Sequence, residues 1–388
     1  EDLAGFIQGF TGSNRHVLDY LAEEVFYCQP EEVQDFLLRT SVLDRLSGPL
    51  CDALTGEDNG RRMLERLEAA NLFVVPLDDE RRWYRYHHLF SGFLRERLER
   101  TQPGAARGLH RRASAWYEAG GCLSEAVDHA LAAEDFESAA RLLERHGDGM
   151  WLRGETARLL RWLEALPDEL LRDRPSLCLF RAGVLIHAGR RDGFETWLRA
   201  AEGAARSVAA DEEKAHWLGK AAVIRARAAY MREDVPAIIG FSHRALELLP
   251  EKDVFLREEI SLNLGHAYCA TGDLAAAGRA FAEAAAAGRA AGNLRVAMFA
   301  AWSRSQLKVL EGRLREAEEI LRQALRSAGE ENGGPSPAAG MVHTGVGELL
   351  YERGDLDGAE RHLREGIELG RRGGEVTILV SAYSQLAR

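Results

Sequence analysis

The residue types that could do chemistry in this chain favour ligand recognition over catalysis. Carboxylates are numerous (61), but most lie beside arginines, as in Arg313-Leu-Arg-Glu-Ala-Glu-Glu319, which is typical of solvated helix faces. The sequence contains no His-x3-His, no paired-cysteine metal motif and no Gly-x-Ser-x-Gly. Aromatic side chains that could stack on a flat or sugar-like ligand are instead interleaved with side chains that could bind its polar groups. This candidate ligand set consists of Arg227, Tyr230, His266, Trp302, Gln306, Glu348 and Tyr351.

The elements that must position these residues are helices in an internally repeated stretch. Turns between helices begin at Gly189, Glu233, Gly272, Gly312 and Gly354, at spacings of 44, 39, 40 and 42 residues. Such self-similarity is the signature of stacked repeats. We therefore predict helix from about residue 105 to residue 388, without β-sheet.

The copy around Gly272 shows how such a pair of helices would pack. Gly265 and Ala277 are small enough to let two antiparallel helices approach closely, while Tyr268 and Phe281 would fill the gap between neighbouring pairs. Gly272 would end the first helix in a left-handed backbone conformation. The copy resembles the tetratricopeptide repeat (TPR) position for position, although the period here exceeds the usual 34 residues.

The resemblance to TPR arrays places the candidate ligand set on the concave groove, which the first helix of each pair lines. Counted from the turn residues, all seven members fall on groove positions. The alternative is that Trp302 and Tyr230 pack as core between repeats, as large aromatics at helical spacing usually do. We expect a curved solenoid whose inner wall is free to bind.

The first hundred residues have a different pattern. Helical spacing of apolar residues predicts helices over 13–27, 30–41 and 59–70, then a hairpin over 72–86 and a helix over 88–100. Between the second and third of these, Ser47 or Gly48 with Pro49 opens a short helix that runs through Leu54. This is the order of a winged helix. The predicted fold is therefore all-α: a winged-helix-containing helical arm over 1–104, followed by a TPR-like α–α superhelix, a solenoid, over 105–388.

Several segments of the first 150 residues together resemble the MalT family of large LuxR-type regulators, which belong to the signal-transduction ATPases. The matching segments are Phe10-Thr-Gly-Ser-Asn-Arg15, Val17-Leu-Asp-Tyr-Leu-Ala-Glu-Glu-Val25, Phe36-Leu-Leu-Arg-Thr-Ser-Val-Leu43, Arg85-Tyr-His-His-Leu-Phe-Ser-Gly-Phe-Leu94, His110-Arg-Arg-Ala-Ser-Ala-Trp-Tyr117 and Ala126-Val-Asp-His-Ala-Leu131. The repeats agree with this family in architecture.

The resemblance implies a transcription activator with an N-terminal ATP-binding module, an arm, an inducer-sensing superhelix and a C-terminal helix-turn-helix. This sequence has neither a Gly-x4-Gly-Lys-Ser/Thr phosphate loop nor a recognisable DNA-reading helix pair. We therefore expect a fragment, truncated at the C-terminus, that is not an enzyme and holds no cofactor itself. For the full-length protein the resemblance implies ATP or ADP, self-association, and DNA binding only through the absent C-terminal domain.

The resemblance also implies a nucleotide contact in the full-length protein. A winged-helix histidine of related ATPases touches the diphosphate of ADP, and the spacing to Phe90 and Phe93 makes His87 the first choice and His88 the second. The alternative is structural, with one histidine capping the helix and the other packed beside Tyr86. Arg15 is a further candidate near the nucleotide, with a surface arginine as its alternative.

The amino-acid composition bears on whether the chain binds nucleic acid, forms disulfides or spans a membrane. The net charge of −11 does not favour a nucleic-acid track, which needs a basic surface. Five well-separated cysteines predict free thiols in a reducing cytoplasm, and no apolar run reaches the ~18 residues of a membrane span.

Two functions remain open for the superhelix. The preferred one is a regulatory module whose groove binds a small-molecule inducer or a regulatory protein. The alternative is a TPR-type scaffold that holds a peptide or a partner protein. A closed, partly apolar pocket would favour the sensor, and an open, charged trough would favour the scaffold.

Overall fold

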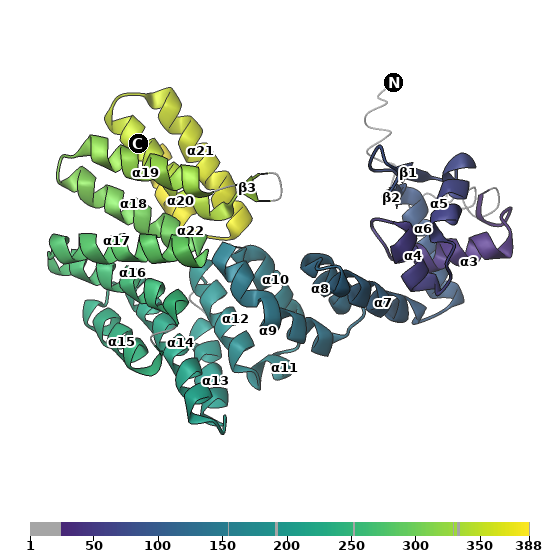
Figure 1. Cartoon of the computed structure of the whole chain (residues 1–388), viewed down its shortest axis with the longest axis horizontal. Helices are drawn as coiled ribbons and strands as arrows, with labels where there is room; N and C mark the ends of the chain where they lie inside the picture. The colour runs from purple at the N-terminus through teal and green to yellow at the C-terminus, as the bar shows by residue number, and fades with distance from the viewer. Residues whose placement is uncertain are drawn as a thin grey trace. The chain divides into compact units, whose positions relative to one another are not determined.

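The computed structural model describes residues 25–153, 155–190, 193–250, 253–328, 330–331 and 334–387, most of which are helical (Figure 1). The chain forms two compact units, which divide between Ala139 and Ala140. Each unit is described by itself. The predicted domain boundary after residue 104 differs from this division and stays a prediction.

The first unit contains the predicted winged helix. Its elements are α3 (Glu31–Thr40), α4 (Gly48–Thr55), α5 (Gly60–Ala69), β1 (Val74–Pro76), β2 (Tyr84–Tyr86) and α6 (His88–Thr101), followed by α7 (Ala105–Ala119) and α8 (Leu123–Ala132). Strands β1 and β2 pair antiparallel, with Val74 opposite Tyr86. Residues at helical spacing, such as Met63, Leu64 and Leu67 of α5, are buried. The predicted order of helices, hairpin and helix is confirmed from residue 30 onward, and the predicted helix over 13–27 lies mostly outside the described residues.

The second unit is the predicted TPR-like superhelix. After α9 (Phe136–Arg153), which begins in the first unit, its helices are α10 (Thr156–Ala165), α11 (Asp168–Arg172), α12 (Pro175–His187), α13 (Phe194–Arg206), α14 (Asp211–Tyr230), α15 (Val235–Leu248), α16 (Val254–Thr271), α17 (Leu274–Ala291), α18 (Leu294–Leu310), α19 (Leu314–Ala328), α20 (Gly340–Glu352), α21 (Leu356–Gly373) and α22 (Val376–Leu386). From α12 to α22 each helix packs against the next one, and α14, α16, α18, α20 and α22 form one continuous layer.

The turns predicted from the sequence are where the helices end. The φ angles are 68° at Gly189, 58° at Glu233, 83° at Gly272, 74° at Gly312 and 79° at Gly354. All five are left-handed, the conformation that glycine adopts without steric cost.

The close approach predicted at Gly265 is also confirmed. A Cβ atom at this position would lie 2.5 Å from the ring of Phe281, which is 1% exposed. Ala277 is fully buried in the same cluster. The pair α16 and α17 is therefore held close by a glycine on one helix and an aromatic ring on the other.

Helices α10 and α12 contact the residues between α21 and α22, which the sequence did not indicate. Thr156 donates a hydrogen bond to the carbonyl of Gly373, and His187 Nδ1 lies 3.2 Å from Glu375 Oε2. A Cβ atom at Gly374 would lie 2.9 Å from the Cβ of Ala157. We call this contact, made by Thr156, His187, Gly373 and Glu375, the closing seam. Glycines permit it because a larger side chain would hold the two ends apart.

One expectation was wrong in detail. Strands β3 (Glu330–Glu331) and β4 (Gly334–Pro335) form a two-residue antiparallel ladder after residue 105, within the long loop between α19 and α20. The physical reason is local, since the ladder pairs backbone groups that such a loop would otherwise leave to water. The helix pairs on either side are unaffected. A search of the described residues finds no helix long and apolar enough for a bilayer span.

Candidate functional site

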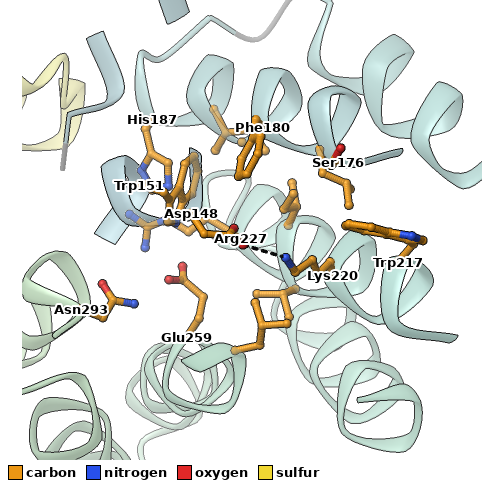
Figure 2. A pocket seen from close by; sticks show the side chains of 16 residues that line it. Asp148, Trp151, Ser176, Phe180, His187, Trp217, Lys220, Arg227, Glu259 and Asn293 are labelled. Atoms are coloured by element: carbon orange, nitrogen blue, oxygen red, sulfur yellow. Dashed lines mark hydrogen bonds and ion pairs between the residues drawn. The ribbon is translucent and has the colours of Figure 1, made fainter. Parts of the chain in front are cut away.

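A pocket in the second unit is bounded by α9, α12, α14 and α16 (Figure 2). It encloses about 700 Å³ of empty space, part of which is open to solvent. The lining residues are Asp148, Trp151, Ser176, Leu179, Phe180, Gly183, Ile186, His187, Trp217, Lys220, Val223, Ile224, Arg227, Leu256, Glu259 and Asn293.

Most of this lining is an apolar wall, and helix α12 supplies a large part of it. Ten of the thirteen residues of α12 are buried, so the helix packs against neighbours on one side and faces the pocket on another. Gly183 makes room for Trp151, because a Cβ atom there would lie 2.5 Å from the indole ring. Phe180 of α12 and Trp217 of α14 are further aromatic parts of the wall.

Some polar residues of the pocket, among them His187 and Glu259, lie close to two buried arginines, and we call this part of the lining the floor. Arg295 is inaccessible to solvent; it forms an ion pair with Glu259 and lies 5.3 Å from the ring of Trp151. Arg227 is 3% exposed, and its guanidinium lies over the rings of Tyr230, at 5.0 Å, and Phe299, at 5.7 Å. Its Nε and Nη1 atoms are buried and have no hydrogen-bond partner in the described part of the chain.

The closing seam reaches this floor through His187. Burial lowers the pKa of His187, and the charges of Arg295 and Arg227 add to that effect against the opposing influence of Glu375. The imidazole is therefore neutral at pH 7 and donates its Nδ1 proton to the carboxylate. Burial acts to raise the pKa of Glu375, but His187 and the two arginines outweigh it and hold that pKa below its ordinary value.

The rim of the pocket carries an ion pair between Lys220 and Asp148, whose Nζ and Oδ2 atoms are 3.5 Å apart (Figure 2). The Lys220 ammonium also lies 5.2 Å from the ring of Trp217. Pairs of this kind are weak when one partner is half-exposed, as Asp148 is. The rim can therefore rearrange at little cost when a ligand enters.

Only Arg227 of the candidate ligand set lines this pocket. Other members bond to one another across successive helices. Tyr230 stacks on His266 with ring centroids 4.2 Å apart, and His266 Nε2 lies 3.3 Å from Ser303 Oγ. Gln306 donates to Glu348. At these points the inner faces of α14, α16, α18 and α20 already hold one another, so this part of the wall is occupied by the protein's own partners.

The remaining two members, Trp302 and Tyr351, differ in exposure. Trp302 is half-buried against the cluster around Phe281, and a Cβ atom at Gly345 would lie 2.8 Å from its ring. This is the packing that the core alternative describes. Tyr351 is 36% exposed. A ligand role for these two residues stays a prediction.

The two histidines of the winged helix are exposed side by side on the first unit. Their ring centroids are 4.4 Å apart. His87 is the residue before α6, but its side chain makes no capping hydrogen bond. Burial lowers the pKa of His87, and His88 and Arg85 lower it further. Arg15 lies outside the described residues.

Sequence reasoning missed the pocket residues of α9 and α12, notably Trp151, Phe180 and His187. They precede the repeats from which the groove positions were counted. A signal was present, because a helix that is apolar all round, as Pro175–His187 is, has to be covered on every side. In the described residues there is no cluster of three or more His, Cys, Asp or Glu side chains that could hold a metal ion.

The fold and the site together define a winged helix joined to a TPR-type array that encloses a pocket. Residues 22–106 match the family model of the MalT winged helix domain, and residues 219–388 match that of the MalT-like TPR region. The chain thus carries both of these MalT-type domains.

Similar proteins agree with this assignment. The chain is 33% identical to the serine/threonine-protein kinase PknK of Mycobacterium tuberculosis, over 98% of this chain and 34% of that protein. It is 30% identical to the HTH-type transcriptional regulator MalT of Serratia proteamaculans, over 91% of this chain and 39% of that one. The chain therefore spans about a third of the length of the curated relatives it matches.

A solved structure shares the fold. It is a signal transduction ATPase with numerous domains (STAND) that has a tetratricopeptide repeat sensor, from Pyrococcus horikoshii. The match has a TM-score of 0.55 at 14% identity and covers 92% of this chain and 53% of that one.

Proposed function

We propose that this chain is the non-catalytic, inducer-sensing segment of an ATP-dependent MalT-type transcription regulator, and that its superhelix binds a small molecule. The observation that carries the proposal is the pocket, whose wall is mostly apolar and whose polar side chains lie at the floor and at the rim. An open, charged trough would have favoured a peptide-binding scaffold. The similarity to the regulator MalT and to a STAND protein with a TPR sensor supports the same function.

A switching mechanism follows from the place of the pocket in the unit. The floor residue His187 also belongs to the closing seam, so a ligand on the floor and the contact between the first and last helices share one side chain. A ligand can shift a conformational equilibrium only by its difference in affinity for the two states. Here that difference would arise where pocket and seam meet.

The test is a thermal-shift screen of the 388-residue chain against sugars, aromatic acids and nucleotides. We expect at least one compound class to raise the unfolding temperature. Trp217→Ala removes one of the aromatic side chains of the pocket wall. The ligand concentration needed for the same rise in unfolding temperature should therefore increase tenfold or more. Trp302→Ala, a matched aromatic outside the pocket, should lower the unfolding temperature of the free chain but keep the response.

Two results would contradict this proposal. Absence of any response across the three classes would argue against a small-molecule sensor and for the scaffold. Loss of the response in Trp302→Ala with retention in Trp217→Ala would move the binding site from the pocket to the groove positions predicted from the sequence.

For the full-length protein we propose that His87 contacts the diphosphate of bound ADP, with His88 as the second choice. The support is that both rings are exposed and adjacent, and that the His87 side chain is not used as a helix cap. In the full-length protein His87→Ala should speed the release of a fluorescent ADP analogue by about tenfold, the usual worth of a hydrogen bond to a charged group. His88→Ala is the control, and equal release rates in both variants and the parent would contradict the contact.

A further inference from the structure

We propose that the ligand of this pocket is a small molecule with a flat, apolar body and a single carboxylate, which pairs with Arg227. This inference rests on the proposed function, because it requires the pocket to be a ligand site. It goes further by naming the chemistry of the ligand and the residue that recognises it.

The first observation is an unused hydrogen-bonding surface. The buried guanidinium of Arg227 leaves Nε and Nη1 without partners in the described part of the chain, although it lines an accessible pocket. Two carboxylates of this region have other partners: Glu259 pairs with Arg295, and Glu375 contacts His187 through Oε2. Unmade hydrogen bonds of a buried cation are costly. A carboxylate oxygen can accept a charge-assisted hydrogen bond from such a nitrogen, and bonds of this kind are about twice as strong as those between neutral groups.

The second observation is the electrostatic field around that guanidinium. Burial lowers the pKa of His266 to about 3, and the charge of Arg227 contributes. The charge of Arg227 also lowers the pKa of His187 and the pKa of the ionised Glu375, as a nearby positive charge should. The neighbourhood of Arg227 therefore disfavours a further cation and favours an anion.

The ion pairs of the pocket bear on the charge that its ligand carries. Arg295 already has Glu259 as its ion-pair partner, and Lys220 at the rim has Asp148. Arg227 is the lining cation for which no ion pair is found in the described residues. A carboxylate carries one charge, whereas a phosphate monoester carries about −1.5 to −2 near pH 7 and would need a second cation.

The wall determines the rest of the ligand. Away from the floor the lining is formed by Trp151, Phe180, Trp217 and aliphatic side chains such as Leu179 and Ile224. A sugar has hydroxyl groups all round and would bury several of them against this wall without partners. A flat apolar body leaves no polar group unpaired there and can lie against the aromatic rings.

The experiment compares acids with their own amides. The 388-residue chain is titrated at pH 7.5 with benzoate, phenylacetate, 3-phenylpropionate, indole-3-acetate and indole-3-propionate, and with the primary amide of each, by calorimetry and thermal shift. We expect at least one acid to bind tenfold or more tightly than its amide. Arg227→Gln should remove that difference, and Arg227→Lys should keep only part of it because the ammonium lacks the planar fork.

The chain offers a matched control on the same helix. Arg225, two residues away in α14, is paired with Glu202 and Glu195 and does not line the pocket. Arg225→Gln should keep the difference between acid and amide. If Arg227→Gln does not fold, as circular dichroism would show, Arg227→Lys carries the test, and an unchanged acid affinity in it contradicts the inference.

The outcomes separate this inference from the proposed function. The inference is overturned if no acid binds, if acids bind no better than amides, or if the difference survives in Arg227→Gln. If amides or sugars bind, and Trp217→Ala weakens that binding, the pocket remains a ligand site and only the carboxylate assignment is lost. The proposed function fails as well only if no compound of any class binds.

Discussion

The side chain of His266 shows how strongly the interior of the second unit can change a single group. Its ring stacks on Tyr230, lies 5.1 Å from the ring of Phe281 and has Ser303 as its polar neighbour. Burial first, and the charge of Arg227 second, lower its pKa to about 3. The imidazole is therefore held neutral over the whole range in which a free histidine titrates.

This property gives a prediction about acid stability. The pKa in the folded state lies below the unfolded value near 6.5, so the unfolded chain binds the additional proton as the pH falls. His266 should therefore contribute a loss of unfolding free energy below pH 6.5 that approaches about 1.4 kcal/mol per pH unit. His266→Phe should flatten that slope, measured by urea denaturation between pH 7 and pH 4.5. Equal slopes in the variant and the parent would mean that the histidine is charged or exposed in the folded chain.

At the scale of the helical pair, the turn at Glu233 is the exception among the five repeat turns. It adopts φ 58°, where the other four turns have glycine. A left-handed backbone costs a residue with a Cβ atom about 1–2 kcal/mol. Glu233→Gly should therefore raise the free energy of unfolding by about 1 kcal/mol, as measured by chemical denaturation.

The neighbouring Arg232 provides the control for that substitution. It is exposed like Glu233 but does not have a positive φ. Arg232→Gly should destabilise the chain, since glycine loses more conformational freedom on folding than other residues. If both substitutions destabilise equally, the turn at Glu233 is not left-handed.

The contact between α16 and α17 makes a second prediction about an element. Gly265→Ala would place a Cβ atom 2.5 Å from the ring of Phe281, and overpacking of this kind costs about 1–3 kcal/mol. Gly278→Ala in α17, where the nearest atom would be 3.9 Å away, should instead stabilise by up to about 1 kcal/mol, because alanine is the better helix former. Thermal unfolding of the two variants measures the contrast, and stabilisation by both would mean that the helices are farther apart.

Sequence patterns at this scale were sufficient for the repeats and insufficient for the pocket. The turns at Gly272 and Gly354, and the close packing at Gly265, follow from local spacing, which a single sequence displays. The pocket depends on which side of α12 meets α9 and α14, and no local pattern encodes that choice. Counting predicted a groove position for Arg227, which lines the pocket, but the count could not reveal that His266 and Gln306 have partners in the next repeat.

On the scale of the whole second unit, the closing seam joins residues that are far apart in the sequence. His187 and Glu375 are separated by 188 positions and are both about 2% exposed. A double-mutant cycle with His187→Phe and Glu375→Gln should therefore give a coupling energy of about 1.5–3 kcal/mol, the range for a buried hydrogen bond to a charged group. Strict additivity of the two substitutions would show that the ends of the superhelix do not meet.

The seam also bears on how this unit exchanges its amide protons with solvent. In a linear array each repeat touches only its neighbours, so the outermost helices fray first and are the least protected. Here α10 and α12 at one end are bonded to the residues that flank α21 and α22 at the other. Neither α10 and α12 nor α21 and α22 can open without breaking the contacts of the closing seam. Deuterium uptake should therefore be nearly as slow in α22 as in α14, and the second unit should open as one cooperative block.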